Sequence, residues 1–233
     1  TASCNQSEST ENTPINDKKN PSAYSAGAVL WQQHAAEYEA LCYQAYNLGE
    51  RRLDELVDTN KTYEKPLAVV MDIDETVLDN SSYNATLIKN ELLYSKKSWM
   101  EWTAMQSADL VPGALEFIQY AKSKNVEVIF ISNRMEAELD DTYQNVIDLG
   151  IDTVSKSNYY LKSTTSNKDE RRANVADKYE VILFFGDNLG DFNGVFDDTT
   201  VIERKKHVKN FRPLFGDKLI ILPNPMYGEW ESA

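Results

Sequence analysis

Two acidic residues, Asp72 and Asp74, directly follow a run of five apolar residues at 67–71. The run is preceded by Pro66 and has the composition of a buried parallel strand. Alternate residues of an extended chain point to the same side, so both carboxylates are expected to face one crevice at the carboxyl end of the strand, where open α/β sheets bind ligands. Two anions this close repel each other unless they share a proton or a metal. The pair therefore indicates a divalent cation, or an acid kept protonated as a proton donor.

Further polar residues follow two later apolar segments, each expected to be a strand of the same sheet. Ser132 and Asn133 come after residues 126–131, and the sequence Gly-Asp-x-x-x-Asp at 186–191 comes after residues 181–185. Ligands bind beyond the carboxyl ends of the strands in such sheets, so these groups are expected beside the acidic pair.

A lysine between these segments is the candidate cation for holding a phosphoryl group. Lys168 follows Ser166 and Asn167 at an expected helix start, where Ser166 and Asp169 have the spacing of a capping box. Lys162 is a competing candidate, but no helix start of that kind adjoins it.

The alternation of strands and helices predicts an α/β fold: a Rossmann-like, mostly parallel sheet with helices on both faces, plus a small helical lobe. A disordered polar tether is expected at 1–20, followed by N-terminal helices of the lobe at 21–62 and the first strand with its motif at 63–82. A helical insertion of the lobe is expected at 83–110, and the rest of the core with the C-terminal tail at 111–233. Gly49 is expected to break the helical segment 22–57. Further helices are predicted at 113–124 and 136–149, and further strands at 159–161, 199–202 and 219–222.

In chain order the motifs are Asp-x-Asp-x-Thr, a hydroxyl, a lysine and Gly-Asp-x-x-x-Asp. This order resembles the haloacid dehalogenase superfamily of aspartyl-phosphate enzymes, and the four acids resemble its four-aspartate phosphatases. The surrounding sequence is similar to the bacterial class C acid phosphatases, which are surface lipoproteins with 5′-nucleotidase activity. That similarity covers roughly residues 26–231 and is carried by residues 68–81, 111–117, 186–192 and 222–231.

The resemblance assigns the chemistry to the four acids. Asp72 is the candidate nucleophile, which forms an aspartyl phosphate that water then cleaves. Asp74 is the candidate general acid and base, because the leaving group needs a proton and the attacking water must lose one. One Mg²⁺ is expected on Asp72, the backbone carbonyl of Asp74 and Asp187, with Asp191 acting through a water molecule.

Other residues are expected to bind the substrate or to shape the loop. Ser132, Asn133 and Lys168 are predicted to hold the phosphoryl oxygens. Thr76 is expected to brace the loop through its hydroxyl, and Glu75 is expected to be solvated.

Three aromatic residues are candidates for a clamp on a base or aryl group, since stacking contributes about 1–3 kcal/mol per base. Tyr227 and Trp99 are the predicted substrate-binding pair, and Trp102 is the weaker candidate. In the absence of these roles all three would be core residues. His34 and His207 lie apart from every motif, which disfavours a histidine phosphatase mechanism.

The net charge is −13, so a nucleic acid polymer or an anionic membrane surface is not an expected partner. No apolar run approaches the roughly 18 residues of a membrane span. Cys4 follows three small residues, as the lipidated cysteine of a bacterial lipoprotein does, which predicts a lipid anchor on the outer membrane of the cell envelope. The alternative is an unmodified cysteine. Cys42 is expected in the core, and a homodimer is compatible with the sequence, which does not fix the oligomeric state.

The leading hypothesis is a Mg²⁺-dependent acid phosphatase that hydrolyses phosphate monoesters, with nucleoside 5′-monophosphates as the expected substrates. A phosphotransferase that passes the same group to an alcohol is the second hypothesis. The third is a non-catalytic surface binding lipoprotein on the same fold.

Overall fold

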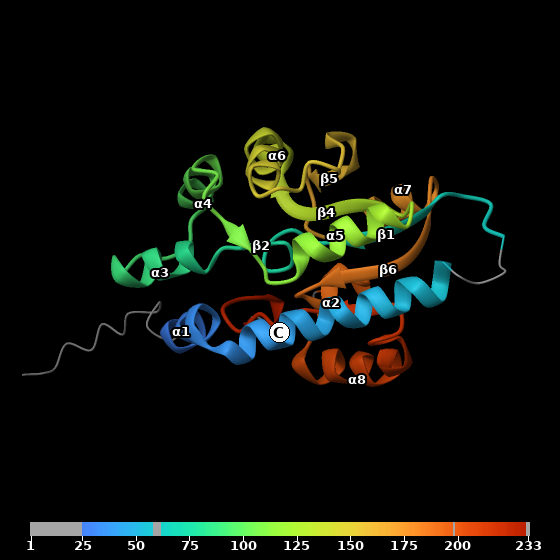
Figure 1. Cartoon of the computed structure of the whole chain (residues 1–233). Coiled ribbons are helices and arrows are strands. Elements are labelled where there is room, and N and C mark those ends of the chain that lie inside the picture. The colour runs from blue at the N-terminus through green and yellow to red at the C-terminus, as the bar shows by residue number, and fades with distance from the viewer. Residues whose placement is uncertain (1–24, 58–61, 198, 232–233) are drawn as a thin grey trace, which may run out of the picture.

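The computed structural model describes residues 25–57, 62–197 and 199–231. Its centre is a parallel five-stranded sheet in the order β5-β4-β1-β6-β7. Figure 1 labels β5, β4, β1 and β6 of this sheet. The strands are β1 (Leu67–Met71), β4 (Glu127–Met135), β5 (Tyr159–Lys162), β6 (Glu180–Gly186) and β7 (Leu219–Ile221). The α/β fold with a mostly parallel sheet is therefore confirmed.

The apolar run of β1 is continuous because both of its faces are buried. Val69 and Met71 pack into the larger hydrophobic cluster, whereas Ala68 and Val70 pack into a smaller one on the other side. Three helices contribute to the larger cluster and α7 to the smaller one. They are α2 (Ala36–Val57), α5 (Ala114–Ser123), α6 (Leu139–Asp148) and α7 (Asp169–Ala176).

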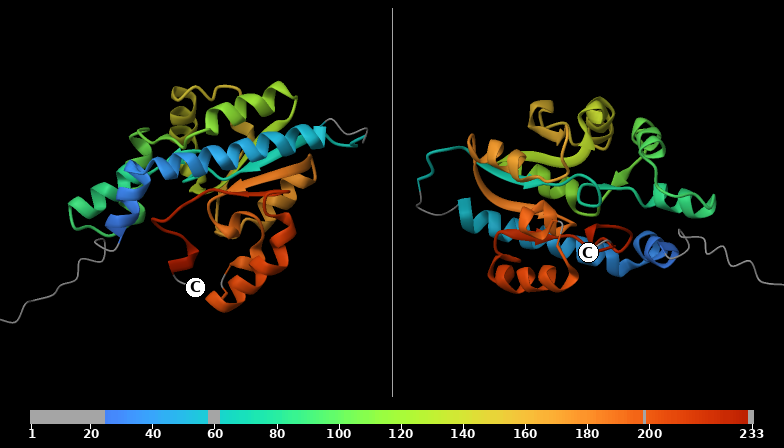
Figure 2. Two further views of the ribbon diagram at one scale, coloured as in Figure 1. Left: turned by 60° about the horizontal axis from the view of Figure 1, so that its bottom comes forward. Right: turned by 180° about the vertical axis from the view of Figure 1, so that it is seen from behind.

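Three shorter helices extend beyond the carboxyl end of β1 and form the helical lobe, which is seen in Figures 1 and 2. They are α1 (Ala26–His34), α3 (Ser81–Lys89) and α4 (Lys96–Ala104). α1 packs against α3, and α4 packs against α6. A two-stranded antiparallel ladder closes the insertion at its base, made of β2 (Leu78–Asp79) and β3 (Asp109–Leu110).

Gly49 does not break the helical segment; α1 and α2 are separated at Ala35 instead. Gly49 lies inside α2, where a Cβ atom would come within 2.4 Å of the Phe185 ring. The glycine therefore allows the helix to pack closely on the sheet. Cys42, also on α2, is a buried free thiol, as expected.

Two further predictions about secondary structure are wrong, one about the type of an element and one about where a strand ends. Residues 199–202 are not a strand: Thr200 caps α8 (Val201–Phe211) by accepting a hydrogen bond from the Glu203 amide at 3.3 Å. This capping outweighs the β propensity of the Thr-Thr-Val-Ile run. In addition, β4 continues to Met135, so Ser132 and Asn133 lie within the strand and not after it.

The capping box expected at Ser166 is not formed. Lys168 is the residue that precedes α7, and its side chain makes no cap. The oxygen of the Asn167 side chain accepts a hydrogen bond from the Asp169 amide at 2.8 Å in its place. Among the residues that the structure describes, every helix is too short or too polar to span a bilayer.

Candidate active site

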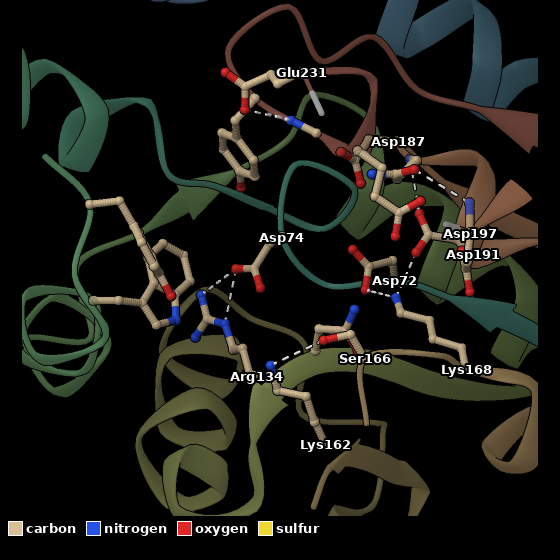
Figure 3. Close-up of a pocket in the computed structure, with 18 of the residues that line it drawn as sticks. Asp72, Asp74, Arg134, Lys162, Ser166, Lys168, Asp187, Asp191, Asp197 and Glu231 are labelled. Carbon is tan, nitrogen blue, oxygen red and sulfur yellow. Dashed lines mark hydrogen bonds and ion pairs between the residues drawn. The ribbon is translucent and has the colours of Figure 1, made fainter. Parts of the chain in front are cut away.

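Three carboxylates meet at the carboxyl edge of the sheet. Asp72 follows β1, and Asp187 and Asp191 follow β6, the neighbouring strand. One oxygen of each lies within 4.8 Å of the others, and Figure 3 shows the three side chains close together. Asp72 and Asp191 are each 8% exposed, so this negative charge is largely removed from water. The pairing of β1 with β6 is what brings acids that are distant in sequence together.

Lys168 supplies positive charge to this cluster. Its buried ammonium donates hydrogen bonds to Asp72 at 2.5 Å, to Asp191 at 2.6 Å and to the Ile131 carbonyl at 2.8 Å. Burial acts to lower the pKa of Lys168, but the Asp191 and Asp72 carboxylates raise that pKa above its ordinary value. The side chain therefore stays charged where a phosphoryl group would need a cation.

Asp187 has no such partner and forms no ion pair with any described Lys or Arg. Its carboxylate accepts hydrogen bonds from the Asn224 amide at 2.8 Å and from the Thr76 hydroxyl at 3.5 Å. The second contact agrees with the bracing role expected of Thr76. Burial, together with the charges of Asp191 and Asp72, raises the pKa of Asp187 well above its ordinary value.

These residues fit a divalent cation, on the chemistry of the donors. Three clustered carboxylates are balanced by one ammonium, which leaves buried negative charge that a metal would neutralise. Burial raises the pKa of Asp72 to about 7, although the Lys168 charge opposes this. Carboxylate oxygens are the hard ligands that Mg²⁺ prefers.

Asp74 is held by a group that the sequence analysis missed. Arg134, which is 2% exposed, donates to Asp74 Oδ1 from Nε at 2.9 Å and from Nη2 at 2.8 Å. The Asn80 amide donates to the same oxygen at 2.9 Å, and the Ser132 hydroxyl lies 3.5 Å from Oδ2. A third nitrogen of the guanidinium donates to the Thr142 hydroxyl at 3.1 Å. Asp74 thus has a fixed orientation at the edge of a cavity that Asp72 and Lys168 also line.

Two of the three residues predicted to bind phosphate line this cavity. Asn133 and Lys168 line it, whereas the Ser132 hydroxyl is fully buried behind Asp74. Arg171 holds the β4 end by donating to the Ser132 carbonyl at 2.5 Å and to the Asn133 side chain at 2.7 Å. Lys162 also lines the cavity, but it does not contact the acids.

Aromatic rings form a wall of the same cavity, which has a volume of about 560 Å³. Tyr83, Tyr94 and Trp99 from the insertion and Tyr227 from the C-terminal segment line it. The Tyr83 and Trp99 rings meet edge to face with centroids 5.2 Å apart. Trp102 lies behind this wall, where its indole donates to Asn80 at 2.8 Å. The structure thus brings Tyr227 and Trp99 to the acids and leaves Trp102 in a supporting position.

Glu75 is not solvated, contrary to expectation, because it is fully buried. Its carboxylate accepts hydrogen bonds from the Gln32 side chain at 2.7 Å, from the backbone amide of Asn80 at 3.1 Å and from the Tyr227 hydroxyl at 2.9 Å. Burial, with the charge of Asp79 as a smaller cause, raises the pKa of Glu75 to about 8. Two of the donors, Gln32 and Tyr227, lie far along the chain from Glu75, so its position next to Asp74 gives no sequence signal of burial.

Arg134 did have a signal. It is two residues beyond Ser132 in an extended strand, so both side chains lie on one side of β4. An arginine on that side, at the carboxyl end of the strand, is placed to reach the acidic pair after β1.

Comparison with known proteins agrees with this geometry. Residues 3–230 match the model of the HAD superfamily, subfamily IIIB (acid phosphatase). The fold is similar to two solved structures of the class C acid phosphatase from Bacillus anthracis, one of them with tungstate bound. Each has 40% sequence identity and a TM-score of 0.87, covering 92% of this chain and 89% of that chain. The resemblance drawn from the motifs is confirmed: the chain belongs to subfamily IIIB of the HAD superfamily, the acid phosphatases, and is a phosphomonoesterase.

Proposed function

We propose that this protein hydrolyses phosphate monoesters, with nucleoside 5′-monophosphates preferred, through an aspartyl phosphate on Asp72 and with Mg²⁺ as cofactor. The observation that carries the proposal is the placement of Asp72. Its carboxylate contacts the Lys168 ammonium, belongs to the acidic cluster, and opens to the same cavity as Asp74. A nucleophile, a cation and a proton donor are thus within one site.

In the first half-reaction an oxygen of Asp72 attacks phosphorus and the ester P–O bond breaks. The leaving oxygen takes a proton from Asp74. Arg134 and Asn80 donate to Oδ1 of Asp74, whereas Oδ2 has only the long contact with the Ser132 hydroxyl at 3.5 Å, so we assign the proton to Oδ2. Lys168 stabilises the charge of the transferring group.

In the second half-reaction water attacks the phosphorus of the aspartyl phosphate. Asp74 accepts a proton from that water, the acyl P–O bond breaks, and inorganic phosphate leaves with Asp72 restored. Asp72, the Asp74 carbonyl and Asp187 would hold the Mg²⁺, with Asp191 acting through water. When bound, the cation offsets negative charge on the phosphoryl oxygens.

The substrate preference rests on the aromatic wall. Trp99 and Tyr227 line the cavity that also contains Asp72, so a phosphate at Asp72 would place its organic group against these rings. The related Bacillus anthracis structure holds tungstate, a tetrahedral oxyanion like phosphate, which supports oxyanion binding in this fold. Stacking does not depend on base identity, so similar use of different bases is expected.

Single-turnover kinetics with radiolabelled AMP tests this function. Asp72 should become labelled during turnover, and Asp72→Asn should remain folded and show no labelling. Added alcohol separates hydrolysis from phosphoryl transfer: a hydrolase releases inorganic phosphate in step with nucleoside. If turnover persisted without any labelled protein, covalent catalysis would be wrong.

We further propose that Cys4 carries a lipid anchor to the outer membrane. Cys4 lies outside the described residues, and the support is the three small residues before it and the polar composition of residues 1–20. Cys4→Ser in the intact precursor should move the protein from the membrane fraction to the soluble fraction. An unchanged distribution would remove the anchor.

A further inference from the structure

Glu75 has a backbone conformation that is uncommon for a residue with a side chain. Its φ is +58°, in the left-handed region, and its amide donates to the Leu78 carbonyl at 2.8 Å. Its neighbour Asp74 lines the cavity, whereas Glu75 is 0% exposed. The turn therefore sends two consecutive carboxylates to different places. Backbone strain of this kind tends to persist where the surrounding structure fixes it for a function.

The Glu75 carboxylate connects three separate segments of the chain. One oxygen accepts from Gln32 on α1 at 2.7 Å. The other accepts from the backbone amide of Asn80, which precedes α3, at 3.1 Å and from the Tyr227 hydroxyl of the C-terminal segment at 2.9 Å. One side chain thus ties the helical lobe and the C-terminal segment to the loop that carries the acidic pair.

These donors are all neutral, and Glu75 forms no ion pair with any Lys or Arg in the described part of the chain. A buried carboxylate is normally paired with a cation, because burial without one is costly. The fold buries the Glu75 carboxylate despite this free-energy cost, at a position next to Asp74. The fold therefore holds the acceptor oxygens of Glu75 at this position, and one of them holds the Tyr227 hydroxyl.

Tyr227 is fixed at two points, and Glu75 is one of them. Asn224 accepts from the Tyr227 amide at 3.4 Å and donates to Asp187 at 2.8 Å, which ties the backbone to the acidic cluster. The hydroxyl of Tyr227 is held by Glu75 at 2.9 Å. With both ends anchored, the ring between them lines the cavity in one orientation.

We propose that Glu75 is a positioning residue for substrate specificity. It acts through the Tyr227 hydroxyl and sets the orientation of the Tyr227 ring against the organic group of the substrate. Gln32 extends this control to α1, so the helical lobe and the specificity wall are mechanically connected. The proposal rests on the proposed function, which places the organic group beside Tyr227.

A double-mutant cycle on Glu75→Ala and Tyr227→Phe tests this. Tyr227→Phe keeps the ring and removes only the hydroxyl that Glu75 holds. Each single variant should raise KM for AMP by about threefold or more with kcat nearly unchanged. The KM of the double variant should be no higher than that of the single variant with the higher KM. The loss on glycerol 2-phosphate, which has no ring, should be clearly smaller than the loss on AMP in all three.

Glu75→Gln supplies a rescue, because its amide oxygen still accepts from the Tyr227 hydroxyl. Among the described residues the Gln32 amide oxygen has no partner, so Gln32 can turn over to accept from the new amide, with loss of its hydrogen bond to Asp79 at 3.0 Å. KM for AMP should return to within about twofold of the original. If Glu75→Ala does not fold, Tyr227→Phe with Glu75→Gln still decides the matter: no KM change in Tyr227→Phe would overturn the proposal.

Glu138→Ala is the matched control. Glu138 is also a buried glutamate with neutral donors, accepting from the Thr103 hydroxyl at 2.9 Å and the Met135 amide at 2.7 Å. Its loss should lower Tm without changing the preference for AMP over glycerol 2-phosphate. Additive losses in the double-mutant cycle, or equal losses on both substrates, would contradict the role of Glu75. Unchanged AMP kinetics in Tyr227→Ala would instead refute the proposed substrate preference.

Discussion

Arg134 donates two hydrogen bonds to a single oxygen of Asp74, at 2.9 and 2.8 Å. The guanidinium is itself fixed, because it donates to Thr142 at 3.1 Å and lies 5.6 Å from the centre of the Trp99 ring. The proposed proton donor is therefore held by a rigid, buried cation that also contacts the aromatic wall. Arg134 acts on the chemistry through the orientation of Asp74.

Substitution of Arg134 should affect esters according to their leaving group. Arg134→Lys keeps a charge but cannot make both hydrogen bonds, so kcat for AMP should fall by about tenfold or more. The loss on p-nitrophenyl phosphate should be much smaller, because its leaving group scarcely needs a proton. Arg204→Lys, at a buried arginine that does not contact Asp74, is the control and should show no such dependence. Equal losses of kcat on both esters in Arg134→Lys would separate Arg134 from the proton transfer.

Removal of single acids should rank their contributions to metal binding. Asp187→Ala should weaken Mg²⁺ binding more than Asp191→Ala, because Asp187 forms no ion pair with a described Lys or Arg, whereas Asp191 is paired with Lys168 at 2.6 Å. Titration calorimetry on the metal-free protein measures both. Chelation should also abolish turnover, and Mg²⁺ should restore it. The opposite order of affinities would show that the two carboxylates have been assigned to the wrong positions around the metal.

Truncation of the aromatic wall should lower nucleotide efficiency. Trp99→Ala and Tyr227→Ala should each reduce kcat/KM for nucleoside monophosphates by roughly tenfold, equivalent to about 1.4 kcal/mol, and leave phosphate inhibition nearly unchanged. Trp102→Ala is the comparison, since its ring stands behind the wall. If steady-state kinetics changed only in Trp102→Ala, packing and not stacking would explain the effect.

The metal-free protein should become less stable as pH rises. In the folded protein the pKa of Asp72 is raised to about 7 and the pKa of Glu75 to about 8. In the unfolded chain both groups lose their protons near the ordinary pKa values of 3.8 and 4.5. The folded state thus binds more protons across this interval, so the free energy of unfolding decreases from about pH 4 to about pH 8. Thermal unfolding in chelator at pH 5 and pH 8 measures this.

Two comparisons sharpen that experiment. Saturating Mg²⁺ should recover stability mainly at the higher pH, because the cation stabilises ionised carboxylates. Glu75→Gln should flatten the pH dependence, since it removes one of the titrating groups. A Tm in chelator that rose from pH 5 to pH 8 would contradict the shifted pKa values.

The position of the acids could be predicted from the sequence because their environment is local. An apolar run that ends in Asp72 and Asp74 indicates a strand end at the ligand-binding edge, and the run before Asp187 indicates a neighbour. The fate of Glu75 could not be predicted in this way, since its burial depends on Gln32 and Tyr227, which lie far from it in sequence.

Local propensity also misled where packing decides. Gly49 reads as a helix break, yet it sits where the Phe185 ring leaves no space for a Cβ atom. The run at 199–202 reads as a strand, yet Thr200 caps a helix there. The contact with Phe185 is invisible to a pattern of residue types, whereas Thr200 and Glu203 have the spacing of a capping box, which signals a helix start.

The most direct test of the central claim is a structure of the Mg²⁺-loaded protein with beryllium fluoride, a mimic of the phosphoryl group. Beryllium should be bonded to a carboxylate oxygen of Asp72, with its fluorines facing Lys168. Beryllium bonded to any other residue, or a fluoride complex that bonds to no side chain at all, would contradict Asp72 as the nucleophile.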